Sequence, residues 1–177
     1  MAEAATWLAR LDDAEARWCR RMNRACDRRP VHLVFAAASR LGDGVFWYAL
    51  IAALPVLYGA PGATLSIRML AAGAVGLALY RWLKERLVRE RPCAADGRIR
   101  PGARALDRYS FPSGHTLHAV CFTILAVHGF GELAVVLVPF ATLVAASRVV
   151  LGLHYPSDVA AGALIGAGLA GLAIGLA

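Results

Sequence analysis

Several features that are common in soluble or secreted proteins are missing from this chain of 177 residues. The four cysteines form no closely spaced CxxC pair, so neither a zinc ribbon nor a disulfide framework is indicated. Small apolar packing groups are the simpler interpretation of these cysteines. The first 30 residues lack the apolar run of a cleavable signal peptide. Charged residues make up only 18% of the chain, whereas 59% is hydrophobic, and an ordinary soluble domain is less apolar than this.

The apolar residues occur in long runs rather than in periodic stripes. A membrane-spanning helix needs about 20 mostly apolar residues, and five segments approach this length. They are residues 43–60, 63–83, 113–130, 131–150 and 157–177. The sequence therefore predicts an all-α integral membrane helical bundle with about five spanning helices, or six as the alternative. We expect residues 31–177 to form one transmembrane domain.

The first 30 residues carry a different pattern. Apolar side chains recur every three or four positions, at Trp7, Leu11, Ala14, Trp18, Met22 and Cys26. Arginines fill mainly the other faces, which predicts a basic amphipathic helix lying in the lipid headgroup layer. A solvated helix packed on protein is the alternative. Residues 31–41 are apolar but too short to span, which indicates a re-entrant or interfacial segment.

Basic residues concentrate on one face of the predicted bundle. Of 19 lysines and arginines, only Lys84 is a lysine, and only Arg68 falls toward the opposite helix ends. The positive-inside rule places the richly basic face in the cytoplasm, so we expect a multi-pass protein of the cell inner (cytoplasmic) membrane. The periplasmic face is the alternative, because cations that belong to a functional site do not report orientation.

Polar residues at the helix ends converge on the same face. They lie in KERLVRERP (84–92), PSGH (112–115) and SRVVLGLHYPSD (147–158). These stretches supply Lys84, Arg91 and Arg148, whose donors suit an oxyanion such as phosphate. Ser113 is a predicted helix N-cap, and the backbone amide of Gly114 lies where a helix N-terminus favours an anion. The sequence therefore predicts a phosphate-binding site.

Two histidines and a carboxylate complete this set. His154 and Asp158 are four residues apart, so the carboxylate can hold one ring nitrogen and raise the basicity of the other, as a nucleophile requires. His115 can hold a proton for a departing oxygen. A zinc site formed by His115, His118, His154 and Asp158 is the alternative, but three nearby cations would repel a metal and no HExxH motif is present. We therefore expect no metal or other cofactor, and His118 is more simply structural.

The three stretches have the forms K-x6-R-P, PSGH and S-R-x5-H-x3-D, and they resemble the signature motifs of the type 2 phosphatidic acid phosphatase (PAP2) superfamily of membrane lipid phosphatases. The resemblance covers residues 84–158. It implies that His154 attacks phosphorus to give a phosphohistidine, aided by Asp158, and that His115 protonates the leaving lipid oxygen without help from a metal. The phosphate-binding positions that it implies are Lys84, Arg91, Ser113, Gly114 and Arg148. Many bacterial members have six spans and act on the periplasmic side, which differs from the five spans and cytoplasmic site expected here.

Together these features predict a phosphatase that hydrolyses the phosphate monoester or diphosphate of a lipid. Candidate substrates are phosphatidic acid, phosphatidylglycerol phosphate, and polyprenyl phosphates or diphosphates. A lipid phosphotransferase with the same site is one alternative, and a catalytically silent lipid-binding or transport protein is another. The expected partners are the lipid substrate and the bilayer, with no nucleic acid, and the sequence leaves the oligomeric state open.

Overall fold

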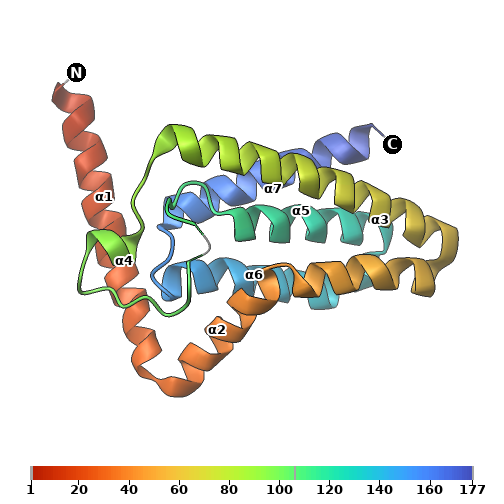
Figure 1. Cartoon of the computed structure of the whole chain (residues 1–177), viewed down its shortest axis with the longest axis horizontal. Helices are drawn as coiled ribbons and strands as arrows, with labels where there is room; N and C mark the ends of the chain where they lie inside the picture. The colour runs from red at the N-terminus through yellow and green to blue at the C-terminus, as the bar shows by residue number, and fades with distance from the viewer. Residues whose placement is uncertain (1, 106, 177) are drawn as a thin grey trace.

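The computed structural model of the chain describes residues 2–105 and 107–176, with side chains from residue 13 onward. Every regular element in these ranges is a helix. In chain order they are α1 (Ala2–Asn23), η1 (Arg24–Asp27), α2 (Arg29–Gly42), α3 (Val45–Leu87), α4 (Pro92–Ala95), α5 (Gly114–Gly129), η2 (Gly131–Leu133), α6 (Ala134–Val150) and α7 (Pro156–Gly175). Figure 1 shows α3, α5, α6 and α7 running along the long axis of the molecule.

Helix α3 doubles back on itself and contains both of the first two predicted apolar segments. Its backbone leaves helical geometry at Gly59, where φ is 60° and ψ is −138°, a conformation that glycine adopts because it lacks a Cβ atom. Pro61 follows and removes a helical hydrogen bond. The separation of this region into the two predicted apolar segments, 43–60 and 63–83, is therefore confirmed. Near the bend the two halves are joined by a 2.7 Å hydrogen bond from Ser66 Oγ to the Ile51 carbonyl oxygen, and farther from it they diverge (Figure 1).

Helices α5 and α7 pack closely because two glycines remove the side chains between them. A Cβ atom on Gly162 would lie 2.5 Å from the Ser113 carbonyl oxygen, and one on Gly166 would lie 2.3 Å from the Leu117 carbonyl oxygen. The Gly162-x-x-x-Gly166 motif therefore serves packing within the chain, as its form predicts. Around α5 the core is completed by apolar residues of α3 and α6, including Trp47, Met69, Leu137 and Val144.

The outer surface of the bundle is apolar. Within residues 2–105 and 107–176, three helical stretches are long and apolar enough to cross a membrane, namely Val45–Ala95, Gly131–Val150 and Pro156–Gly175. Large apolar side chains on these stretches face outward, with Val56 84% exposed and Leu164 74% exposed. Extended apolar surfaces are rare on water-facing proteins and suit a lipid environment. The chain is therefore an all-helical membrane protein.

Helices α1 and α2 pack at one end of the bundle, where α1 lies across the helix ends (Figure 1). Trp18 on α1 is 60% exposed, whereas Cys19 beside it is fully buried against protein. Trp7 and Leu11 of the predicted stripe lie outside the side chains that the structure describes. The segment predicted to be interfacial or re-entrant forms α2, which packs on α6 with Gly42 against Val144. The connection from α3 to α5 contains the short helix α4, which begins at Pro92, a residue suited to a first helical turn.

Candidate active site

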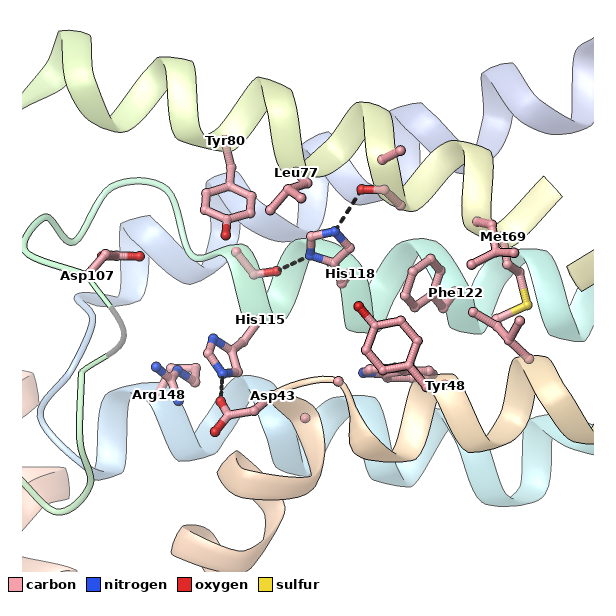
Figure 2. A pocket seen from close by; sticks show the side chains of 18 of the residues that line it. Asp43, Tyr48, Met69, Leu77, Tyr80, Asp107, His115, His118, Phe122 and Arg148 are labelled. Atoms are coloured by element: carbon pink, nitrogen blue, oxygen red, sulfur yellow. Dashed lines mark hydrogen bonds and ion pairs between the residues drawn. The ribbon is translucent and has the colours of Figure 1, made fainter. Parts of the chain in front are cut away.

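A cavity of about 370 Å³ lies between the two halves of α3 and helix α5. Its cationic end is lined by Lys84, Arg91, His115, Arg148 and His154. Its apolar end is lined by Trp47, Ile51, Met69, Leu70 and Phe122. Figure 2 shows Arg148 and His115 near one end and Met69 and Phe122 toward the other. The cavity can therefore hold a molecule that is anionic at one end and apolar at the other.

The three predicted cations come together at the cationic end. Lys84 lies in the last turn of α3, Arg91 precedes α4, and Arg148 lies in the last turn of α6. All three side chains are buried. Arg148 Nη1 donates a 2.5 Å hydrogen bond to Ser39 Oγ of α2, while its Nε has no hydrogen-bond partner among the described residues. Buried donors without partners are unfavourable, so this corner of the cavity is suited to an anion.

A carboxylate that the motifs do not include contacts two of these cations. Asp107 accepts hydrogen bonds from Lys84 Nζ at 2.7 Å to both of its oxygens and from Arg91 Nη2 at 2.6 Å. Burial raises the pKa of Asp107, but the hydrogen bonds and charges of Lys84 and Arg91 outweigh it and bring the pKa below its usual range. The ionised carboxylate therefore uses donors that a phosphate would also need. Its position in an irregular loop gave no sequence signal of this contact.

His154 and Asp158 lie together, in the contact that their spacing predicts. The distance from His154 Nδ1 to Asp158 Oδ2 is 3.6 Å, longer than a hydrogen bond, so the expected direct bond is not formed in this structure. The other ring nitrogen, Nε2, lies 3.1 Å from Arg91 Nη1. Burial first, and then the charges of Arg148 and Arg91, lower the pKa of His154 well below its usual value. The imidazole is therefore neutral near pH 7, with a lone pair that can act as a nucleophile.

The N-terminus of α5 forms another wall of the cationic end. Ser113 is the N-cap, and its hydroxyl accepts a 3.5 Å hydrogen bond from the Thr116 amide, which confirms the predicted cap. Gly114 lines the cavity opposite Tyr80, whose ring would lie 3.2 Å from a Cβ atom at this position. Ser113 itself is fully buried behind the cavity wall. Ser113 therefore begins helix α5, whose first residues, Gly114 and His115, line the cavity.

His115 extends from α5 into the cationic end and pairs with a second carboxylate outside the motifs. Its Nε2 is hydrogen-bonded to Asp43 Oδ1 at the junction of α2 and α3 (Figure 2). Burial raises the pKa of Asp43, but the His115 contact and the charge of Arg148 bring it below its usual range. An ionised carboxylate at this point opposes the burial and the charge of Arg148, both of which disfavour a proton on His115. Asp43 lies in the stretch LGDG (41–44), whose residues are typical of a turn and whose spacing does not indicate this partner.

His118 is held by backbone groups rather than by other histidines. Its Nδ1 lies 2.9 Å from the Gly114 carbonyl oxygen and its Nε2 lies 3.1 Å from the Gly73 carbonyl oxygen. The Nε2 contact joins α5 to α3, whereas the Nδ1 contact lies within α5, and this agrees with the structural role expected for this residue. No group of three or more His, Cys, Asp or Glu side chains in the described part of the chain is arranged to hold a metal ion.

Comparison with known proteins gives consistent matches. The family model described as PAP2 superfamily matches residues 65–176. The decaprenylphosphoryl-5-phosphoribose phosphatase of Mycobacterium tuberculosis is 45% identical over 62 residues, which are 34% of this chain and 33% of that protein. The match therefore spans about a third of the length of this curated relative.

Two solved structures share the fold. A crystal structure of a transmembrane PAP2 type phosphatidylglycerolphosphate phosphatase from Bacillus subtilis superposes with a TM-score of 0.77, at 25% identity over 94% of this chain and 85% of that chain. Aquifex aeolicus LpxE superposes with a TM-score of 0.72, at 23% identity over 89% of this chain and 92% of that chain.

Proposed function

This chain belongs to the PAP2 superfamily, and on that basis we propose that it is an integral membrane phosphatase that hydrolyses the phosphate monoester or diphosphate of a lipid. One observation carries the proposal. Three buried cations and two histidines line one end of a cavity whose other end is apolar. A lipid phosphate has the same division between a multiply charged headgroup and an apolar chain, so the cavity is complementary to it.

In the proposed reaction the cations position the phosphate, His154 accepts the phosphoryl group and His115 transfers the proton. Lys84, Arg91 and Arg148 hold the phosphoryl oxygens and offset their charge. His154 Nε2 forms a bond to phosphorus while the bond from phosphorus to the lipid oxygen breaks, and that oxygen takes a proton from His115. Water then attacks the phosphohistidine, the bond from nitrogen to phosphorus breaks, and His115 takes the proton of the water. The products are the dephosphorylated lipid and inorganic phosphate.

The two carboxylates that contact the site have different parts in this scheme. Asp43 holds the ring of His115 and opposes the burial and the Arg148 charge that disfavour the protonated form, the form that a proton donor requires. Asp107 accepts hydrogen bonds from donors of Lys84 and Arg91 that a phosphate would also use, so it would compete with phosphate for them.

The substrate class is a lipid that enters from the bilayer with its chain in the apolar end of the cavity. The Mycobacterium relative is named for a decaprenyl lipid with a phosphorylated sugar, and the Bacillus structure is named for phosphatidylglycerolphosphate. Polyprenyl phosphates and glycerophospholipid phosphates are therefore the first candidates for this chain.

We also propose that the chain crosses the membrane five times. Val45–Ala95 doubles back at Gly59 and would account for two crossings, and α5, α6 and α7 for three. The site would then lie on the richly basic face, which the positive-inside rule places in the cytoplasm, with the arm formed by residues 1–30 at the headgroup layer and residues 31–177 as the catalytic domain. Cys93 lies on the site face and is half-buried, so its labelling by an impermeant reagent from outside the cell would overturn this orientation.

The decisive experiment is a phosphate-release assay with purified protein and a panel of lipid phosphates. Wild-type protein should release phosphate, and rapid acid-free quenching with radiolabelled substrate should trap acid-labile label on the protein. His154→Ala should lose both signals, while His128→Ala, which alters an exposed histidine at the opposite end of α5, should keep them. Labelling of His154→Ala would contradict the nucleophile assignment. Transfer of the label to an added alcohol instead of water would favour a phosphotransferase, and no release from any lipid would favour a silent binding protein.

A further inference from the structure

Helix α1 lies outside residues 65–176, the region that the family model matches, yet it contacts the turn that carries His154. Glu15 accepts hydrogen bonds from the Ser157 amide at 2.6 Å and from the Ser157 hydroxyl at 2.8 Å. Asn23 Nδ2 donates to the Val150 carbonyl oxygen at 3.0 Å. The thiol of Cys19 lies 3.8 Å from the carbonyl oxygen of the nucleophile itself. The arm therefore packs against the chain on both sides of the proposed nucleophile.

Arg89 joins this arm to the carboxylate beside the nucleophile. It falls between Lys84 and Arg91 in the sequence but does not line the cavity. Its Nη2 donates to Glu15 Oε2 at 2.6 Å, and its Nη1 donates to Asp158 Oδ1 at 2.7 Å. Its guanidinium also lies over the ring of Tyr155, 4.1 Å from the ring centroid. Arg89 is thus fixed from three sides, as a planar guanidinium with several donors can be.

Both carboxylate oxygens of Asp158 accept hydrogen bonds from groups other than His154. Oδ1 accepts from Arg89, and Oδ2 accepts from the Tyr155 amide at 2.8 Å. His154 Nδ1, at 3.6 Å from Oδ2, has no hydrogen-bond partner among the residues that the structure describes. The charge that Asp158 presents to the nucleophile is therefore offset by Arg89, and its position depends on the contacts of Arg89.

We propose that Arg89 is a positioning residue for the nucleophile, and that Glu15 on α1 holds Arg89 in place. The inference rests on the proposed function and deepens it, because it makes the N-terminal arm part of the catalytic apparatus. Arg89 sets the position of Asp158 and offsets part of its charge, and Asp158 in turn presents that charge to His154 Nδ1 at 3.6 Å. The chain of contacts runs from α1 through Arg89 and α7 to the turn after α6.

The proposal predicts a change in the pH profile. The charged and titratable groups that face His154 are Lys84, Arg91, Arg148, His115, Asp158 and Cys19. Replacing Arg89 with a neutral residue would leave the charge of Asp158 less offset, while the other groups remain. An unshielded nearby carboxylate favours the protonated imidazole, so the pKa of His154 would rise and the acid limb of kcat/KM would move to higher pH.

The test compares Arg89→Gln, Arg89→Lys, Glu15→Gln and the Glu15→Gln/Arg89→Gln double variant. Arg86→Gln, which removes an exposed arginine from the same end of α3, is the matched control. We expect Arg89→Gln to lower kcat about 10-fold with KM changed less than about 3-fold, and to move the acid limb upward by about 0.5 to 1 pH unit. Arg89→Lys keeps the charge, so its acid limb should stay near that of the wild type even where kcat falls.

The double variant shows whether Glu15 acts through Arg89. If it does, Glu15→Gln lowers kcat in the wild-type background and causes no further loss beside Arg89→Gln. The inference would be overturned if the loss of kcat in the double variant equalled the product of the two single losses. It would also be overturned if the acid limb did not move in Arg89→Gln. Either result would leave the proposed function intact. If Arg89→Gln does not fold, Arg89→Lys and Glu15→Gln provide the test. The inference would then be overturned if both variants had the same kcat as the wild type. Absence of hydrolysis by the wild type would overturn the proposed function and this inference with it.

Discussion

Neutralising Asp107 should make the enzyme bind phosphate more tightly. This carboxylate accepts three charge-assisted hydrogen bonds from Lys84 and Arg91, at 2.6 to 2.7 Å. Phosphate needs the same donors, so binding must displace the carboxylate or share the cations with it. The Asp107→Asn variant keeps the size of the side chain and removes its charge, and therefore weakens the competitor without opening a hole.

The size of the effect follows from the exposure of the contact. Asp107 is 38% exposed at its side chain, whereas Lys84 is 7% exposed, so water screens one partner. We therefore take the net free energy of the contact as about 1–2 kcal/mol, at the lower end of values for hydrogen bonds to charged groups. Because about 1.4 kcal/mol corresponds to a tenfold change in an equilibrium constant, phosphate should bind about 5- to 30-fold more tightly to Asp107→Asn.

The assay is competitive inhibition of lipid phosphate hydrolysis by inorganic phosphate at constant ionic strength. The inhibition constant should fall in Asp107→Asn and stay unchanged in Asp27→Asn, which neutralises an exposed carboxylate 3.7 Å from Arg100. An inhibition constant that rises in Asp107→Asn would refute the reasoning. It would mean that the carboxylate holds Lys84 and Arg91 in the geometry that binds phosphate, rather than competing for them.

Three other predictions follow from contacts around the site. Asp43→Asn should lower kcat about 10- to 100-fold for lipid phosphates. The loss should be much smaller for p-nitrophenyl phosphate, because its leaving oxygen needs no proton from His115. Equal losses of kcat for both substrates would contradict the orienting role of Asp43. Gly166→Ala places a Cβ atom 2.3 Å from a carbonyl oxygen of α5, so it should cost about 1–3 kcal/mol and lower the unfolding temperature in detergent by several degrees, while Gly168→Ala, which meets open space, should not. Because the pKa of His154 lies well below 6.5, the imidazole stays neutral as pH falls through 6.5, so kcat/KM should hold its plateau there and decline only at more acidic pH; an acid limb at 6.5 or above would disagree.

The cationic end could be predicted from the sequence because its members lie at recognisable helix ends. Lys84, Ser113 and Arg148 each stand where an apolar run begins or stops, and antiparallel helices bring such ends to one face. The spacing from His154 to Asp158 likewise predicted their contact. What the spacing could not give was the distance of 3.6 Å, because it is set by competing donors from Arg89 and the Tyr155 amide.

The carboxylates of the site could not be predicted in the same way. Asp43, Asp107 and Glu15 lie in a turn, an irregular loop and an amphipathic helix, where acidic residues are ordinary. Each becomes part of the site only through long-range packing, with Glu15 and Asp158 separated by most of the chain. Pairing of buried cations is a general need, so an excess of basic residues at one face does indicate that acidic partners must come from elsewhere. It does not indicate which ones.

Because lysine is so scarce in this sequence, the buried side chain of Lys84 can be modified selectively. Lys84 is the only lysine in these 177 residues, and its ammonium is bound by Asp107 and by the Tyr109 carbonyl oxygen at the cationic end of the cavity. Amine-selective acylating reagents would therefore meet a single side-chain target in this chain, and that target lies in the site. The extent of acylation, read from the intact mass of the protein, would report occupancy of the site without any enzymatic turnover, because a bound anion shields the amine.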